Sequence, residues 1–298
     1  MSRDALLRVV ALSFPPRVPS GMAEPRAVII RAPGTNCDAE MARAFALAGA
    51  AVDLVHIDAL TREPALLDQY GLIGFAGGFS YGDDIASGRI FAMRLREKLY
   101  PALRDAVARS TPIIGACNGF QILVQVGLLP GPDDGHSWPE ELAPPQSVSL
   151  CDNVSARFCD RWVEMRSVPA SRCIWTRGVE EAIPAALRPD LFMLPVAHGE
   201  GRLVCKSPEV LDALERSGRV AIRYADNFNG SDNAIAGLCD GSGLIFGLMP
   251  HPERFLDWTR HPYWTRLPAH VRSGPTPGLR MFQNAVAHVR GEALVTNA

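Results

Sequence analysis

A sharp strand-to-helix turn is encoded at residues 111–126, and it limits what this chain can fold into. The apolar run TPII leads into the pentapeptide GACNG at residues 115–119, and FQILVQV then favours a helix. Small residues on both sides of Cys117 allow a tight turn that leaves the thiol exposed on a strained backbone. The helix start also favours the thiolate. We therefore predict that Cys117 is a nucleophile; the alternative is an ordinary buried thiol.

A cysteine nucleophile needs a base, and the segment MPHPER at residues 249–254 offers one. It follows a strand-like run, and prolines on both sides of His251 hold the imidazole in a fixed loop. Glu253 lies two residues on, so in an extended stretch its carboxylate projects to the same side and can orient the ring. Taken alone, the segment could equally be a surface turn. Together with the cysteine turn it favours a catalytic pair.

A second histidine has the same spacing to a carboxylate. His198 and Glu200 lie in the segment VAHGEG, so either histidine could in principle serve Cys117. The sequence distinguishes the two only in part, because glycine and alanine, rather than prolines, surround His198.

A glycine pair supplies the third element of the predicted site. Gly77 and Gly78 follow a strand-like segment, and such a pair presents bare backbone N–H groups that suit an oxyanion hole. The N–H of Asn118, directly after the nucleophile, would be the second donor. The chain contains neither of the glycine-rich phosphate-binding motifs.

Alternating strands and helices predict the fold. We expect strands at 27–31, 51–56 and 71–76 and helices at 38–48 and 89–109, followed by the cysteine turn. This order predicts a three-layer α/β/α fold with a mostly parallel sheet and chemistry at the carboxyl ends of its strands. Residues 131–145 read as a surface loop. Strands expected at 148–151, 161–166, 172–176, 191–197 and 219–225 would form an antiparallel extension, while the roles of 167–190 and 260–277 stay open.

Composition favours a large, intracellular enzyme. The chain has 298 residues, of which 47% are hydrophobic, and a formal net charge of −2, so it can bury a core and gains no general attraction to nucleic acid. Seven cysteines without regular spacing argue against a disulfide framework and suit a reducing cytoplasm. No clustered Cys/His pattern indicates zinc, and we predict no metal in this chain.

The first 25 residues differ from the rest. Their apolar stretch is short and interrupted by Arg8, which argues against a secretory signal or a membrane span. We expect residues 1–25 to be a non-catalytic extension and residues 26–298 to form one catalytic domain.

Five segments together resemble the class I (triad) glutamine amidotransferases, over about Arg26 to Val289. These are PGTNCD at 33–38, GGFSYGD at 77–83, GACNGFQ at 115–121, PVAHGEG at 195–201 and MPHPER at 249–254. The cysteine turn and the H-P-E segment are shared by the whole family. The other three segments resemble the branch that forms the glutaminase component of phosphoribosylformylglycinamidine synthase. The resemblance implies a flavodoxin-like sheet.

The resemblance also implies roles for individual residues. Cys117 would attack the side-chain amide of glutamine, His251 would carry the proton to the departing ammonia, and Glu253 would orient His251. Four further residues would bind the oxyanion or the substrate: Gly78, Phe79, Asn118 and Gln121. Two more, His198 and Glu200, would line the pocket or a partner interface.

Partners follow from the same resemblance. A synthetase subunit, with a small accessory subunit, would hold ATP and Mg²⁺ and accept the ammonia, so this chain would need no cofactor of its own. The docking face would join the loops at 77–84 and 195–201 with the segment 260–277. Two alternatives stay open: a free-standing glutaminase or other cysteine hydrolase of the same superfamily, and a non-catalytic regulatory relative. The intact Cys117, His251 and Glu253 count against the last.

Overall fold

Two β-sheets make up the strand content of the computed structural model, which describes residues 10–11 and 24–292. The strands are β1 (Val10–Ala11), β2 (Arg26–Arg31), β3 (Ala51–His56), β4 (Leu72–Phe75), β5 (Ile113–Ala116), β6 (Val148–Asp152), β7 (Cys159–Ser167), β8 (Met193–His198), β9 (Glu200–Cys205), β10 (Val220–Tyr224), β11 (Ile235–Cys239) and β12 (Ile245–Leu248). The large sheet has the order β1-β3-β2-β4-β5-β12-β11-β10-β7-β8, and β6 pairs with β9 separately.

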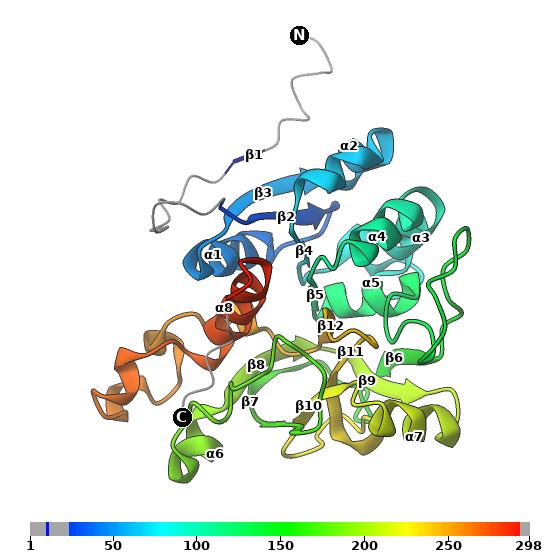
Figure 1. Ribbon diagram of the computed structural model, residues 1–298. Helices are drawn as coiled ribbons and strands as arrows, with labels where there is room; N and C mark the ends of the chain where they lie inside the picture. Colours follow the sequence, from blue (N-terminus) through cyan, green and yellow to red (C-terminus); the bar gives the residue numbers. More distant parts are fainter. Residues whose placement is uncertain (1–9, 12–23, 293–298) are drawn as a thin grey trace.

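Helices cover both faces of the large sheet, as Figure 1 shows. They are α1 (Asp38–Ala48), α2 (Ile57–Arg62), α3 (Arg89–Lys98), α4 (Tyr100–Ala108), α5 (Asn118–Val126), α6 (Arg188–Leu191), α7 (Pro208–Arg216) and α8 (Pro277–Val289). Helices α1 and α8 pack on one face, where Phe45, Trp175 and Phe282 meet edge to face. Helices α3, α4 and α5 lie on the other, over Phe75, Phe91 and Phe120. The predicted three-layer architecture is confirmed.

The parallel half of the sheet places the candidate residues. Strands β3, β2, β4, β5 and β12 run parallel, and β12 pairs with β5 in register from Ile245 opposite Ile113 to Leu248 opposite Ala116. Their carboxyl ends therefore lie at one edge, where the chain continues into the segments that carry Gly77, Cys117 and His251. Strands β11, β10, β7 and β8 add the expected antiparallel extension. The strand expected at 148–151 forms as β6, but in the separate two-stranded sheet.

Two predicted elements are wrong. The helix expected over 89–109 divides into α3 and α4 at Leu99. The cause is Pro101, which has no N–H to continue the helix and whose ring clashes with the preceding turn. The strand expected at 172–176 is a series of turns. Its polar groups pair with single carbonyl groups and not with a neighbouring strand. The N–H of Ile174 donates to the carbonyl of Gly243, and the Trp175 indole donates to the carbonyl of Leu244.

The two segments left open in the sequence lie against the extension rather than in it. Residues 167–190 are mostly turns, and residues 260–277 form short 3₁₀ turns in which His261 is buried and its ring contacts the carbonyl of Asp190 at 2.7 Å. No helix in the described ranges is long and apolar enough to cross a membrane. Of the expected extension at 1–25, only residues 10–11 and 24–25 are among those described.

Candidate active site

Cys117 lies at the junction of β5 and α5, and the backbone there is strained. Its φ of 51° and ψ of −110° are rare for a residue with a side chain. The N–H of Cys117 donates to the carbonyl of Leu248 at 2.8 Å, which fastens the turn to the end of β12. A Cβ on Gly119 would overlap the carbonyl of Phe75, so this glycine is needed for α5 to approach β4. The sharp turn expected from the sequence is present, but Cys117 is only 6% exposed, so the expectation of an exposed thiol is wrong.

His251 and Glu253 form a buried pair in the segment that follows β12. Nδ1 of His251 lies 2.6 Å from Oε1 of Glu253, and both side chains are at most 2% exposed. A Cβ placed on Gly77 would lie 2.6 Å from Cε1 of His251 and 3.4 Å from Cβ of Cys117. The imidazole, the thiol-bearing residue and the glycine loop therefore meet at one point. Because Glu253 occupies Nδ1, Nε2 is left for proton transfer.

The surroundings of His251 favour the imidazolium. Burial alone would disfavour a charged ring, but the Glu253 carboxylate and the neighbouring Cys117 and Cys37 thiols hold the pKa of His251 well above its ordinary value. A ring that keeps its proton beside Cys117 is suited to pass that proton to a leaving group.

Two backbone N–H groups beside Cys117 are available to an oxyanion. Neither the N–H of Gly78 nor that of Asn118 donates a hydrogen bond within the described part of the chain. Gly78 has φ +144°, and a Cβ there would lie 2.6 Å from the carbonyl oxygen of Gly34. Hydrogen bonds from Asn36 N–H to the Gly77 carbonyl and from Phe79 N–H to the Gly34 carbonyl hold the loop in place. Such fixed, unused donors suit a tetrahedral intermediate.

A cavity of about 210 Å³ opens beside the thiol. It is small compared with the roughly 300–1,000 Å³ of pockets for drug-sized ligands, and thus suits a single amino acid. The residues that line it include most of the sequence-predicted set: Gly78, Phe79, Asp83, Ser87, Cys117, Gln121, Asp152, Phe158, Ala197, His198, Gly199 and Glu200.

A polar network behind this cavity joins α5 to the loops around it. The side-chain amide of Asn118 donates to Asp83 at 3.1 Å and to Gln121 at 3.0 Å, and its oxygen accepts from the Ser80 N–H. Gln121 in turn donates to the carbonyl of Glu200. Asn118 therefore anchors the loop after Gly78 through its side chain, while its own N–H stays without an acceptor among the described residues. Burial raises the pKa of Asp83, although hydrogen bonds from Gly88 and Ser87 oppose the shift.

His198 does not form an equivalent pair with Glu200. It is 3% exposed, and neither ring nitrogen has a hydrogen-bond partner in the described residues. The Glu200 carboxylate instead accepts from the N–H of Ser87 at 3.4 Å. Burial, and secondarily the charge of His251, lowers the pKa of His198 to about 4. A neutral ring without an orienting carboxylate fits a wall of the pocket better than a base.

His198 should make stability depend on pH. In the unfolded chain its pKa is near 6.5, so between pH 6.5 and about 4 the unfolded state binds the extra proton. The free energy of unfolding should therefore fall by on the order of 3 kcal/mol as the pH is lowered through this window. Urea unfolding of the parent and of His198→Asn at pH 7 and pH 4.5 measures this. The variant should lose less stability than the parent, and an equal loss would contradict the assignment.

Cys37 and Arg254 are neighbours of the pair that sequence reasoning did not assign to the site. Arg254 donates from Nη2 to Sγ of Cys37 at 3.0 Å, and that thiol donates to Asn36 at 3.3 Å. Cys37 is 1% exposed and precedes α1. The only signal was the N-C-D segment itself, which carried the family resemblance without a role for its thiol.

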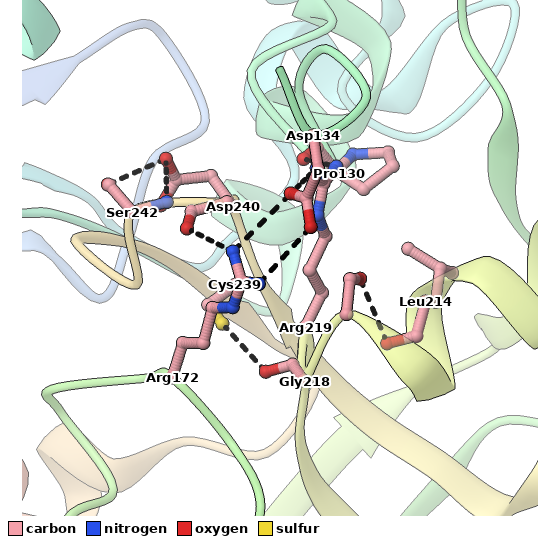
Figure 2. Close-up of polar contacts among 11 residues, drawn as sticks. Pro130, Asp134, Arg172, Leu214, Gly218, Arg219, Cys239, Asp240 and Ser242 are labelled. Carbon is pink, nitrogen blue, oxygen red and sulfur yellow. Dashed lines mark hydrogen bonds and ion pairs between the residues drawn. The ribbon is translucent and has the colours of Figure 1, made fainter.

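A second cavity, of about 430 Å³, lies beyond the opposite end of β12. Figure 2 shows its polar groups: Arg219 donates to Asp134 at 2.7 Å and to the Pro130 carbonyl, and Arg172 pairs with the same carboxylate at 3.2 Å. Asp240 accepts from the N–H groups of Ser242 and of Ile245, the first residue of β12. The charged groups pair with one another, no cysteine lines this cavity, and the Ser242 hydroxyl donates to Asp240, so we interpret the cluster as structural.

Comparisons with known proteins agree with this geometry. A family model described as the CobB/CobQ-like glutamine amidotransferase domain matches residues 24–289. Phosphoribosylformylglycinamidine synthase subunit PurQ of Dehalococcoides mccartyi is 40% identical over 277 residues, covering 90% of this chain and 99% of the relative. PurQ of Methanococcus maripaludis is 34% identical over 285 residues, covering 89% of this chain and 97% of the relative.

A solved structure shows the same fold. The structure of PurLQS from Thermotoga maritima contains a chain that matches with a TM-score of 0.65 at 29% identity, over 90% of this chain and all of that one. Both the sequence relatives and this structure cover nearly the whole of the described catalytic region. The chain therefore belongs to the CobB/CobQ-like glutamine amidotransferase family, and within it to the PurQ subunits of phosphoribosylformylglycinamidine synthase.

Proposed function

We propose that this chain is the glutaminase subunit of phosphoribosylformylglycinamidine synthase, acting in the cytoplasm in purine biosynthesis. It hydrolyses glutamine and passes the ammonia to a synthetase subunit, which converts formylglycinamide ribonucleotide and ATP to formylglycinamidine ribonucleotide. ATP and Mg²⁺ bind on that partner, and this chain needs no cofactor for its own step. Residues 26–298 carry the activity, and residues 1–25 take no part in it.

The chemistry uses the groups that meet at Gly77. The Cys117 thiolate attacks the side-chain carbonyl carbon of glutamine, and the N–H groups of Gly78 and Asn118 stabilise the resulting oxyanion. His251 transfers its proton to the nitrogen as the C–N bond breaks, so ammonia leaves and a thioester remains. A water molecule, deprotonated by His251, then hydrolyses the thioester to glutamate and the free thiol. Glu253 holds the ring in the required tautomer throughout.

One observation carries this proposal: the strained Cys117, which borders the small cavity together with Gly78, also lies beside the buried histidine–carboxylate pair and two unused N–H donors. A non-catalytic relative would have no need to keep the strain at Cys117 or the unsatisfied donors, since each costs stability.

Exposed apolar side chains around this cavity support a docking face for the synthetase. Phe79 and Phe158 line the cavity and are 49% and 57% exposed, and Ile85 is 83% exposed. Ile85 also has φ +74°, which is an outlier for a β-branched residue. No residue of 260–277 lines the cavity, so we restrict the face to the loops at 77–87, 154–158 and 195–201.

The synthetase should activate this chain. The strained, exposed loop around Ile85 carries Asp83 and Ser87 into the wall of the glutamine pocket, and a partner that covers this loop would complete that wall. Adding the synthetase subunit with its nucleotide substrates should therefore raise kcat/KM for glutamine at least about tenfold. Steady-state glutamate release measures this. Full speed without a partner, and no change on its addition, would favour the free-standing glutaminase instead.

A matched pair of variants locates the docking face. Ile85→Asp places a charge in the proposed interface and should remove most of the activation. Leu142→Asp changes an equally exposed leucine, 78% exposed, in the surface loop 131–145 and should leave it intact. Each variant is compared with its own rate in the absence of the synthetase. Equal activation of both variants would place the interface elsewhere.

A further inference from the structure

Three side chains of metal-ligand type meet beside the proposed triad. Sγ of Cys37, a ring nitrogen of His251 and a carboxylate oxygen of Glu253 all lie within 4.8 Å of one another. Cys37 comes from the start of α1, whereas the other two follow β12, so the linear sequence does not reveal the cluster. The proposed hydrolysis uses His251 and Glu253 but gives the thiol of Cys37 no task.

Part of this cluster has unused binding capacity. Oε1 of Glu253 contacts His251, but Oε2 is buried and has no hydrogen-bond partner among the described residues. Glu253 also borders a separate cavity of about 340 Å³, together with Glu40 and Arg254. A buried carboxylate oxygen without a donor, next to an open cavity, is a position where a cation or a water is expected.

The donor set selects the kind of cation. Thiolate, imidazole and carboxylate are the ligands of Zn²⁺, with bond lengths of about 2.3 Å to sulfur and about 2.0 Å to nitrogen or oxygen. Tetrahedral bonding at these lengths places ligand atoms roughly 3.5 Å apart, so a pair at the 4.8 Å limit must close by about 1.3 Å. We propose that Cys37, His251 and Glu253 form an inhibitory site for Zn²⁺ or a similar thiophilic divalent cation.

Arg254 makes this site reversible rather than permanent. Its guanidinium donates to Sγ of Cys37, and a bound cation requires that it turn away. The 340 Å³ cavity gives it space to do so, but Arg43 and Arg260 also border that cavity. The positive charges of these three arginines repel the incoming metal ion and weaken its binding. Zn²⁺ binding releases to solvent the thiol proton of Cys37 and the proton on the ring nitrogen that it takes, and leaves the oxidation state of every group unchanged.

A cation at this site stops the proposed chemistry, whichever ring nitrogen it takes. At Nε2 it occupies the lone pair that would accept the proton of Cys117. At Nδ1 it displaces the Glu253 contact and confines the remaining ring proton to Nε2, so the ring can no longer act as a base. The inhibition thus rests on the proposed glutaminase function, whereas the binding does not.

Cobalt spectroscopy tests the binding without an activity assay. Co²⁺ is added to full-length Cys117→Ser, which lacks the nucleophile's thiol, and should produce a thiolate-to-cobalt charge-transfer band that saturates at one ion per chain and disappears with Zn²⁺. The band should be lost in Cys117→Ser/Cys37→Ser and kept in Cys117→Ser/Cys173→Ser, which removes another buried thiol. A band that survives without Cys37, or no band in Cys117→Ser, overturns the site.

Two further measurements guard against trivial outcomes. Circular dichroism checks that each variant is folded. X-ray absorption of Zn²⁺ bound to Cys117→Ser tests the site without any change at Cys37. One sulfur ligand with nitrogen or oxygen ligands is expected, and a sulfur-free site contradicts the proposal. In glutamine hydrolysis by the parent chain, Zn²⁺ should inhibit and a chelator should restore the rate. Cys37→Ser, compared with its own metal-free rate, should need at least about tenfold more Zn²⁺; equal sensitivity refutes the inhibitory role.

Discussion

Cys117→Ala should abolish glutamine hydrolysis and leave the fold intact. The nucleophile forms the covalent intermediate, so its loss removes the pathway and should lower kcat by at least about 10⁴-fold. Alanine keeps the Cβ, and the backbone turn is held by the contact to Leu248 rather than by the thiol. Glutamate release by the variant is measured beside its circular dichroism spectrum.

Labelling checks the same residue without relying on a loss of activity. A glutamine-like electrophile should add one label to the parent chain, at Cys117, and none to Cys117→Ala. Cys151, Cys159 and Cys205 are partly exposed and provide the internal control, since they lack a neighbouring histidine–carboxylate pair. A label on any of these three, with Cys117 unmodified, would remove the basis for the proposed thioester.

His251→Asn should lower kcat by several orders of magnitude, because nucleophile and base act as a unit. Asparagine is smaller and cannot accept and return a proton, and Glu253 would be left buried without its partner. Stability should therefore fall as well, so kcat is compared at a temperature where the variant remains folded.

His198→Asn is the matched control for this change. Its ring has no orienting carboxylate and lies in the wall of the cavity, so its removal should alter KM for glutamine or activation by the synthetase more than kcat. The result is the ratio of kcat for His198→Asn to kcat for His251→Asn, which should be large. Similar losses of kcat in both variants would mean that the pair at 251 and 253 has no special role.

The local parts of the site were predictable from the sequence because their signals are local. Gly115 and Gly119 flank Cys117, and the structure shows that the second of these has no room for a side chain. The prolines around His251 likewise fix a short segment. In the same way, the helix at Asp38–Ala48 and the strand at Ala51–His56 have the bounds that their periodicity indicated.

What failed depends on contacts between distant segments. The segment 172–176 has strand-like composition, but Trp175 is buried by stacking on Phe246 and packing against Phe282 without any partner strand. The approach of Cys37 to His251 depends on how α1 packs against the segment after β12, which no local pattern encodes. The break at Leu99 is different: Pro101 is a local signal for it, but the apolar periodicity continues on both sides and predicts a single helix.

The pairing of β5 with β12 has a consequence for folding kinetics. The two strands that present Cys117 and His251 are separated by about 130 residues, and they align only after the chain closes that loop. Non-local parallel pairing of this kind forms slowly compared with helices and hairpins. During refolding, secondary structure should consequently recover before glutamine turnover. The chain passes through a period in which most of its helices exist while its nucleophile has no base.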